Sequence, residues 1–234
     1  MHVLGVIPAR GGSKGIPGKN LAQFAGRPLI ALTIDAARAS RRLARVIVST
    51  DDDAIAAEAA RLGAEVPFLR PVALAQDDTP MLPVLAHAAT EMGRQSPPLP
   101  EAVVLLQPTS PLRTAEHIDA AIDLLEQSGS DSVVSVVEVP HQYSPVSVMQ
   151  LDHGRLVPYG GTATVTRRQD KPLVYARNGP AVLAVRTSVL LEARNLYGTD
   201  VRPLVMGHDE SVDIDTSWEL ELVDWLLRRR GARP

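Results

Sequence analysis

Residues 3–20 read Val3-Leu4-Gly5-Val6-Ile7-Pro8-Ala9-Arg10-Gly11-Gly12-Ser13-Lys14-Gly15-Ile16-Pro17-Gly18-Lys19-Asn20, and this stretch decides the fold that the chain is expected to adopt. The run from Val3 to Ile7 is short and β-branched and is stopped by Pro8, a pattern typical of a buried parallel strand that enters a loop. The loop that follows, from Ala9 to Asn20, holds four glycines. A buried strand that runs into a glycine-rich loop indicates an α/β fold.

Strands and helices alternate along the rest of the chain. Further strands are expected over residues 45–50, 65–69, 102–106, 132–139, 182–186 and 201–206. Helices are expected over residues 28–40, 54–62, 79–92, 115–127 and 216–229. This alternation predicts a mainly parallel sheet, with the site outside the carboxyl ends of its strands.

One domain accounts for the whole length. The 234 residues fit a single domain, 1–234, better than two independent domains. The alternation is lost between about residues 140 and 180, and we interpret 140–180 as an insertion. Hydrophobic residues make up 45% and charged residues 22%, which excludes a disordered or fibrous chain.

Composition also limits the partners. A net charge of −3 gives no basic field for nucleic acid, so no nucleic-acid partner is expected and any anion site must be local. Cysteine is absent, which excludes disulfides and thiolate chemistry. No apolar run reaches membrane-spanning length, and residues 1–8 lack the pattern of a signal peptide. We therefore expect a cytoplasmic protein with no membrane partner.

The glycine-rich loop carries three cations, Arg10, Lys14 and Lys19. Glycines let backbone N–H groups approach phosphate oxygens closely, and the cations neutralise charge along a triphosphate. The loop is not a Walker A motif, because Lys19 is followed by Asn20. Its place after a buried strand favours a polyphosphate site over a solvated loop with incidental charge.

Asp213-Ile214-Asp215 places two carboxylates on one side of an extended segment, with Ile214 facing the core. Aligned carboxylates suit Mg²⁺, which takes oxygen ligands and shares them with substrate phosphates. The alternative is that Asp215 only supports the start of the terminal helix. For Asp51-Asp52-Asp53 we favour that plainer interpretation, since acidic residues are preferred where a helix begins.

Two further sets of polar residues are suited to bind a second small molecule beside the polyphosphate. Gln107, Thr109 and Ser110 follow the most apolar strand and are expected in the same crevice as the glycine-rich loop, although Pro108 and Pro111 also fit a plain rigid turn. In the insertion, a charged run containing Arg168 precedes Tyr175 and Asn178. Such a run is usually a solvated face, but a guanidinium fork is also a receptor for carboxylate.

With these motifs, the chain resembles the acylneuraminate (CMP-sialic acid) cytidylyltransferase family in its short bacterial form. The resemblance rests on Ile7 to Gly15, Lys19-Asn20, Leu74-Ala75-Gln76-Asp77, Leu106 to Arg113, Arg168-Gln169-Asp170, Asn178-Gly179 and Ser211 to Thr216. It covers nearly the whole chain in order.

The resemblance implies a Rossmann-like, mainly parallel α/β sheet with helices on both faces, and a homodimer whose partner's insertion helps close the site. It implies CMP transfer from CTP to an acidic sugar, a nonulosonic acid such as N-acylneuraminate or legionaminate, with Mg²⁺ as cofactor and pyrophosphate as product. The residues it assigns to CTP are Ala9, Arg10, Gly11, Ser13, Lys14, Lys19, Asn20, Arg70 and Thr79, with Arg10, Lys14 and Lys19 as the catalytic residues. It assigns Asp213 and Asp215 to the metal, and Gln107, Thr109, Ser110, Arg168, Tyr175 and Asn178 to the acceptor.

One departure keeps other acceptors open. The family commonly has an aromatic residue shortly after its Asn-Gly pair, whereas this chain reads Asn178-Gly179-Pro180-Ala181-Val182-Leu183. A phosphonate or a Kdo-like sugar therefore remains an alternative acceptor, and a sugar-1-phosphate nucleotidyltransferase is the nearest rival enzyme. A non-catalytic nucleotide-binding module is the alternative from another class.

Overall fold

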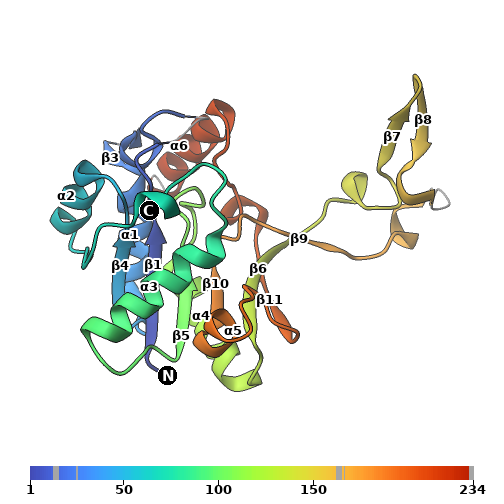
Figure 1. Ribbon diagram of the computed structural model, residues 1–234. Helices are drawn as coiled ribbons and strands as arrows, with labels where there is room; N and C mark the ends of the chain where they lie inside the picture. Colours follow the sequence, from blue (N-terminus) through green and yellow to red (C-terminus); the bar gives the residue numbers. More distant parts are fainter. Residues whose placement is uncertain (13–15, 25, 162–164, 166, 232–234) are drawn as a thin grey trace.

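The fold is built on a seven-stranded mixed sheet in the order β11-β6-β10-β5-β1-β4, with β9 paired to β6 (Figure 1). The computed structural model describes residues 1–12, 16–24, 26–161, 165 and 167–231. The strands are β1 Val3–Pro8, β4 Arg45–Ser49, β5 Ala102–Leu105, β6 Ser132–Glu138, β9 Tyr175–Arg177, β10 Leu183–Arg186 and β11 Val201–Met206. β1 runs parallel to β4 and β5, and β11 runs parallel to β6, whereas β10 is antiparallel to both of its neighbours.

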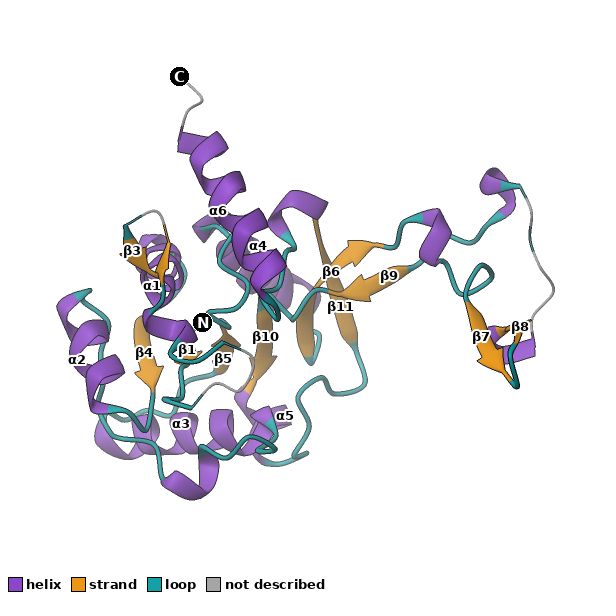
Figure 2. Cartoon of the chain, turned by 90° about the horizontal axis from the view of Figure 1, so that it is seen from above, coloured by secondary structure: helices purple, strands orange, loops and turns teal. Residues whose placement is uncertain are grey.

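Helices cover both faces of this sheet, as predicted. They are α1 Leu29–Ala39, α2 Asp53–Arg61, α3 Met81–Gln95, α4 Ala115–Ser128, α5 Thr187–Leu191 and α6 Ser217–Gly231. Figure 2 shows α3 and α5 on one side of the sheet and α1 and α4 on the other. Because side chains alternate along a strand, Val3 and Ile7 pack with α1 and α4, while Leu4 and Val6 pack with α3. Two apolar cores therefore hold β1 at the centre of the sheet.

One expected strand is wrong. Residues 65–69 make only isolated parallel bridges, Ile47 to Glu65 and Thr50 to Leu69. Pro67 lies between them and has no N–H to donate, so the ladder beside β4 is interrupted. The other expected strands and helices are present, with ends shifted by a few residues.

Between β6 and β10 the chain leaves the sheet as an arm that extends away from the body (Figure 1). The arm carries η3 His141–Tyr143, the hairpin of β7 Met149–Asp152 and β8 Arg155–Pro158, η4 Tyr159–Gly161 and η5 Arg168–Asp170, and returns through β9. Large apolar side chains are exposed along it, including Leu151 at 75% and Leu156 at 69%. Exposed apolar side chains gathered on one projecting segment are typical of a protein interface.

Smaller elements complete the fold. They are the hairpin of β2 Gln23–Phe24 and β3 Arg27–Pro28 and the short helices η1 Lys19–Leu21, η2 Val72–Leu74 and η6 His208–Glu210. None of the helices in the described part of the chain is both long enough and apolar enough to cross a membrane.

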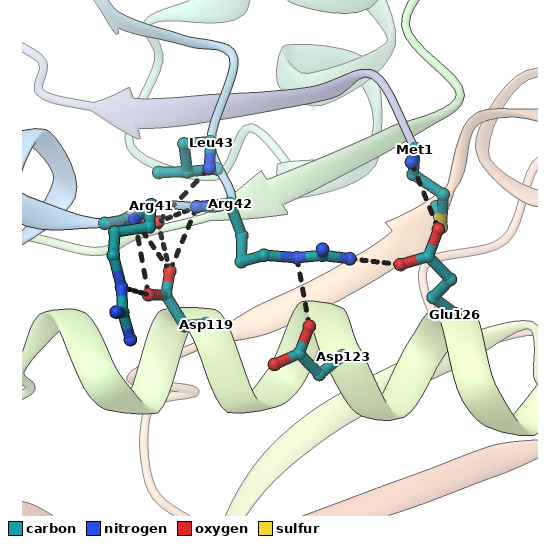
Figure 3. Close-up of polar contacts among 8 residues, drawn as sticks. Met1, Arg41, Arg42, Leu43, Asp119, Asp123 and Glu126 are labelled. Carbon is teal, nitrogen blue, oxygen red and sulfur yellow. Dashed lines mark hydrogen bonds and ion pairs between the residues drawn. The ribbon is translucent and has the colours of Figure 1, made fainter.

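Acidic residues along α4 bind the chain just before β1 and just before β4 (Figure 3). Asp119 accepts hydrogen bonds from the Ser40 hydroxyl at 2.5 Å and from the N–H groups of Arg41 and Arg42 at 3.1 and 3.2 Å. Glu126 pairs with Arg42 and accepts from the amino group of Met1 at 3.1 Å. These contacts tie the start of β1 and the connection between α1 and β4 to one helix.

Replacing Asp119 with alanine should lower the free energy of unfolding by about 1–2 kcal/mol, because the Ser40 hydroxyl and two peptide N–H groups lose their acceptor. The matched control is Asp123→Ala, which removes the more exposed ion pair with Arg42 and should cost no more than about 0.5 kcal/mol. Urea denaturation followed by circular dichroism measures both. Equal losses in the two variants would show that Asp119 acts only as a surface charge.

Candidate active site

Three segments that are distant in sequence meet at the peptide of Ile214. The N–H of Ile214 donates to the carbonyl of Thr109 at 2.8 Å, and Nζ of Lys19 donates to the carbonyl of Ile214 at 2.6 Å. The Ile214 side chain is fully buried, in a cluster with Phe24, Leu29 and Leu112. The loop after β1, the loop after β5 and the segment before α6 are therefore joined at the carboxyl ends of β1 and β5.

The burial of Ile214 sets the positions of the two carboxylates beside it. Asp213 is half-buried, and its Oδ1 accepts a hydrogen bond from the Ser110 hydroxyl at 3.1 Å, whereas Asp215 is exposed. Among the described residues, no group of three or more His, Cys, Asp or Glu side chains is arranged to hold a metal ion. Two carboxylates still fit Mg²⁺, which takes its remaining oxygens from phosphates and water.

A pocket of about 150 Å³ opens beside this junction. Its lining residues are Pro8, Arg10, Asn20, Arg70, Met81, Gln107, Pro108 and Thr109. Arg70 is only 5% exposed, and its Nε and Nη2 have no hydrogen-bond partner among the described residues. Burial lowers the pKa of Arg70, while the carboxylate of Asp51 opposes that shift. The Thr109 hydroxyl is also buried without a described partner, so the pocket offers unpaired polar groups to a ligand.

The described part of the glycine-rich loop is held by its own neighbours. Asn20 Nδ2 donates to the carbonyl of Arg10 at 3.0 Å, and the N–H of Gly11 donates to Asp51 at 3.1 Å. A Cβ on Gly11 would lie 2.6 Å from a carboxylate oxygen of Asp52, so a larger residue there would require the Asp52 side chain to shift. Arg10 forms an ion pair with Asp77. Ser13 and Lys14, both expected to bind CTP, lie outside the described residues.

Asp52 confirms the interpretation of the acidic cluster as the start of a helix. It is the N-cap of α2, and its Oδ1 accepts from the N–H of Ile55 at 2.9 Å.

The loop over residues 107–113 contains a buried cation that the sequence did not assign to the site. Arg113 is 3% exposed, and its guanidinium donates to the carbonyls of Ala181 and Gln107 and to the Thr33 hydroxyl. Burial lowers the pKa of Arg113 to about 9, and the negative charge of Asp213 opposes that shift. The residue therefore stays charged at neutral pH. No sequence pattern revealed this role, because the acceptors are two backbone carbonyls and a hydroxyl on distant segments.

The residues expected to bind the acceptor lie in two different places, some at the pocket and others on the arm. Gln107 donates to the carbonyl of Gly179 at 3.1 Å and lines the pocket. Arg168 and Tyr175 are exposed on the arm, and Arg168 lines a separate cleft that it shares with Lys171 and His141. Thr79, expected at CTP, is half-buried in the turn before α3 and is not among the lining residues of the pocket.

Asn178 has a structural place that differs from the acceptor contact expected from the sequence. It is 5% exposed, and its Oδ1 accepts from the Ser135 hydroxyl at 2.6 Å. Its Nδ2 donates to the Ser211 hydroxyl at 2.8 Å and to the sulfur of Met206 at 3.4 Å. The amide therefore has protein partners at both ends, and these bonds shape the turn before β10.

Comparison with known proteins decides the family. A family model described as cytidylyltransferase matches residues 4–206. The chain is 35% identical over 237 residues to the CMP-N,N'-diacetyllegionaminic acid synthase of Legionella pneumophila, covering 98% of this chain and 96% of that protein. The chain belongs to the cytidylyltransferase family. It is therefore a nucleotidyltransferase, and the resemblance predicted from its motifs is confirmed.

Other relatives extend this result. The chain is 30% identical over 241 residues to the N-acylneuraminate cytidylyltransferase of Escherichia coli, covering 99% of this chain and 53% of that longer protein. Among solved structures, a CMP:2-keto-3-deoxy-manno-octonic acid synthetase complexed with CTP superposes with a TM-score of 0.72. At 17% identity, covering 98% of this chain and 100% of that one, it confirms the α/β fold of this cytidylyltransferase.

The buried hydrogen bonds of Asn178 should contribute to the stability of the fold. Asn178→Ala should lower the free energy of unfolding by about 1–3 kcal/mol, because the buried Ser135 hydroxyl loses its acceptor. Gln107→Ala, which removes a half-exposed amide, is the control and should stay within about 0.5 kcal/mol of the wild-type value. Thermal unfolding of both variants measures the difference. A stable Asn178→Ala protein with an increased KM for the acceptor would instead show that Asn178 binds the acceptor.

Proposed function

We propose that this cytidylyltransferase transfers CMP from CTP to an acidic sugar of the nonulosonic acid class and releases pyrophosphate. The observation that carries the proposal is the hydrogen bond from Lys19 to the carbonyl of Ile214. It fixes a cation of the glycine-rich loop beside Asp213 and Asp215, where phosphate and metal would meet. The names of the relatives in Legionella pneumophila and Escherichia coli support an acceptor of this class.

The pocket around Arg70 is the proposed site of the cytosine base. Cytosine presents two adjacent hydrogen-bond acceptors, O2 and N3, which suit Nε and Nη2 of Arg70. Neither nitrogen has a hydrogen-bond partner among the described residues, and Nη2 lies 4.0 Å from a carboxylate oxygen of Asp51. A buried cation with unpaired donors rejects ligands that cannot accept those bonds. The triphosphate would then lie along Arg10, Lys14 and Lys19.

Asp213 and Asp215 would hold Mg²⁺, which supplies charge neutralisation at the phosphate oxygens. Lys19 would neutralise charge on the α-phosphate from the same side, and Arg10 would position the leaving phosphates. The acceptor hydroxyl, oriented by Gln107 and Thr109 while Ser110 holds Asp213, would attack the α-phosphorus in line, and pyrophosphate would leave. Positioning and charge neutralisation supply most of the acceleration in such a transfer.

The arm is the proposed dimerisation segment of a cytoplasmic homodimer. Its apolar side chains, including Leu151 and Leu156, are exposed, and contact with a second copy of the chain would bury them. Arg168 and Tyr175 are exposed on the same arm and would reach the acceptor in the partner's site. A guanidinium is suited to the carboxylate of an acidic sugar, because its paired N–H groups match two carboxylate oxygens.

The reaction is tested by pyrophosphate release from each of the four NTPs with Mg²⁺, against nonulosonic acids, Kdo and phosphonates. We expect release with CTP and one acidic acceptor, and a decrease in kcat of about 100-fold or more in Asp213→Ala and Asp215→Ala. Asp209→Ala is the matched control, since that exposed carboxylate lies just before the segment and should leave kcat unchanged.

Tight CTP binding with no release on any acceptor would favour a non-catalytic binding module. Absence of CTP binding, or full activity in Asp213→Ala, would refute the proposed reaction. Release with a phosphonate or Kdo alone would keep the reaction and correct the acceptor.

A further inference from the structure

The loop over residues 107–113 is closed on itself by the side chain of its last residue. Nη2 of Arg113 donates to the carbonyl of Gln107, and Nε donates to the carbonyl of Ala181 at 2.7 Å. The third contact, from Nη1 to the Thr33 hydroxyl at 2.9 Å, fixes the guanidinium to α1. One buried group therefore joins both ends of the loop to the turn before β10.

This loop in turn holds the segment with the two carboxylates. The Thr109 carbonyl accepts from the N–H of Ile214 at 2.8 Å, and the Ser110 hydroxyl donates to Asp213 at 3.1 Å. The turn packs against the same atoms, since a Cβ on Gly179 would lie 2.8 Å from the Ser110 hydroxyl and 3.4 Å from the carboxyl carbon of Asp213. A displacement of either the loop or the turn would therefore move Asp213.

We propose that Arg113 is a positioning residue for the magnesium site, holding the 107–113 loop and the 178–181 turn in the arrangement that presents Asp213 to the metal. The inference rests on the proposed function, and Arg113 itself touches neither substrate nor metal. Its planar fork binds carbonyls in different directions at once, which the single ammonium group of lysine cannot reproduce. Residues that orient metal ligands typically change metal affinity when they are replaced.

The test compares CTP binding with and without metal, by calorimetry in the absence of acceptor so that no sugar is modified. The ratio of Kd in EDTA to Kd in Mg²⁺ reports how well the metal site is formed. In Arg113→Lys we expect this ratio to fall by about ten-fold, whatever the change of Kd in EDTA, because Gln107, Pro108 and Thr109 of the same loop also line the Arg70 pocket and the ratio isolates the metal site. Thr33→Val is the matched control: it removes one acceptor of Arg113 but leaves both carbonyl contacts, so the ratio should not change.

A wild-type ratio in Arg113→Lys, or an equal fall in Thr33→Val, would overturn the inference. Equal weakening of CTP binding with and without Mg²⁺ in Arg113→Lys would likewise overturn it, since Arg113 would then support the nucleotide pocket and not the metal site. A wild-type chain that binds no CTP, or binds it without any effect of Mg²⁺, would instead refute the proposed function on which the inference rests.

Discussion

The active site depends on the backbone of Ile214, whose N–H and carbonyl are bonded to loops that follow different strands. Its N–H is held by the carbonyl of Thr109 and its carbonyl by the ammonium of Lys19. The Ile214 side chain between these bonds is fully buried, whereas the flanking Asp213 is half-buried and Asp215 is exposed. A hydrophobic residue thus sets the direction of two charged ones, and core packing and site geometry are one constraint.

The turn over residues 178–181 lies at the site because the sheet contains both parallel and antiparallel strands. β10 runs antiparallel to β5, with Leu183 paired to Leu105, so the residues before β10 lie beside the residues after β5. Asn178 and Gly179 therefore reach the carboxyl edge of the sheet from the opposite chain direction, and Gln107 can bond to Gly179. In an all-parallel sheet that turn would lie at the opposite ends of the strands.

Much of this arrangement could be predicted from local patterns. The buried strand and glycine-rich loop, the alternation of Asp213-Ile214-Asp215, and the helix start at Asp52 each depend on residues close in sequence. The burial of Arg113 and Asn178 could not be predicted, because their partners are carbonyls and hydroxyls on segments distant in sequence. The failed strand over 65–69 has a local cause, Pro67, whose missing N–H interrupts an otherwise apolar extended run. The direction of β10 depends on the path of the arm, which carries no periodic pattern.

The central claim is that Asp213 and Asp215 act with the glycine-rich loop as one metal-dependent nucleotide site. Anomalous diffraction from crystals grown with CTP and Mn²⁺, in place of Mg²⁺, tests it most directly. The account predicts a manganese peak bound by the carboxylates of Asp213 and Asp215 and by a phosphate of CTP, with the base in the Arg70 pocket. A peak at other residues, or CTP bound away from Arg70 and Lys19, would contradict it.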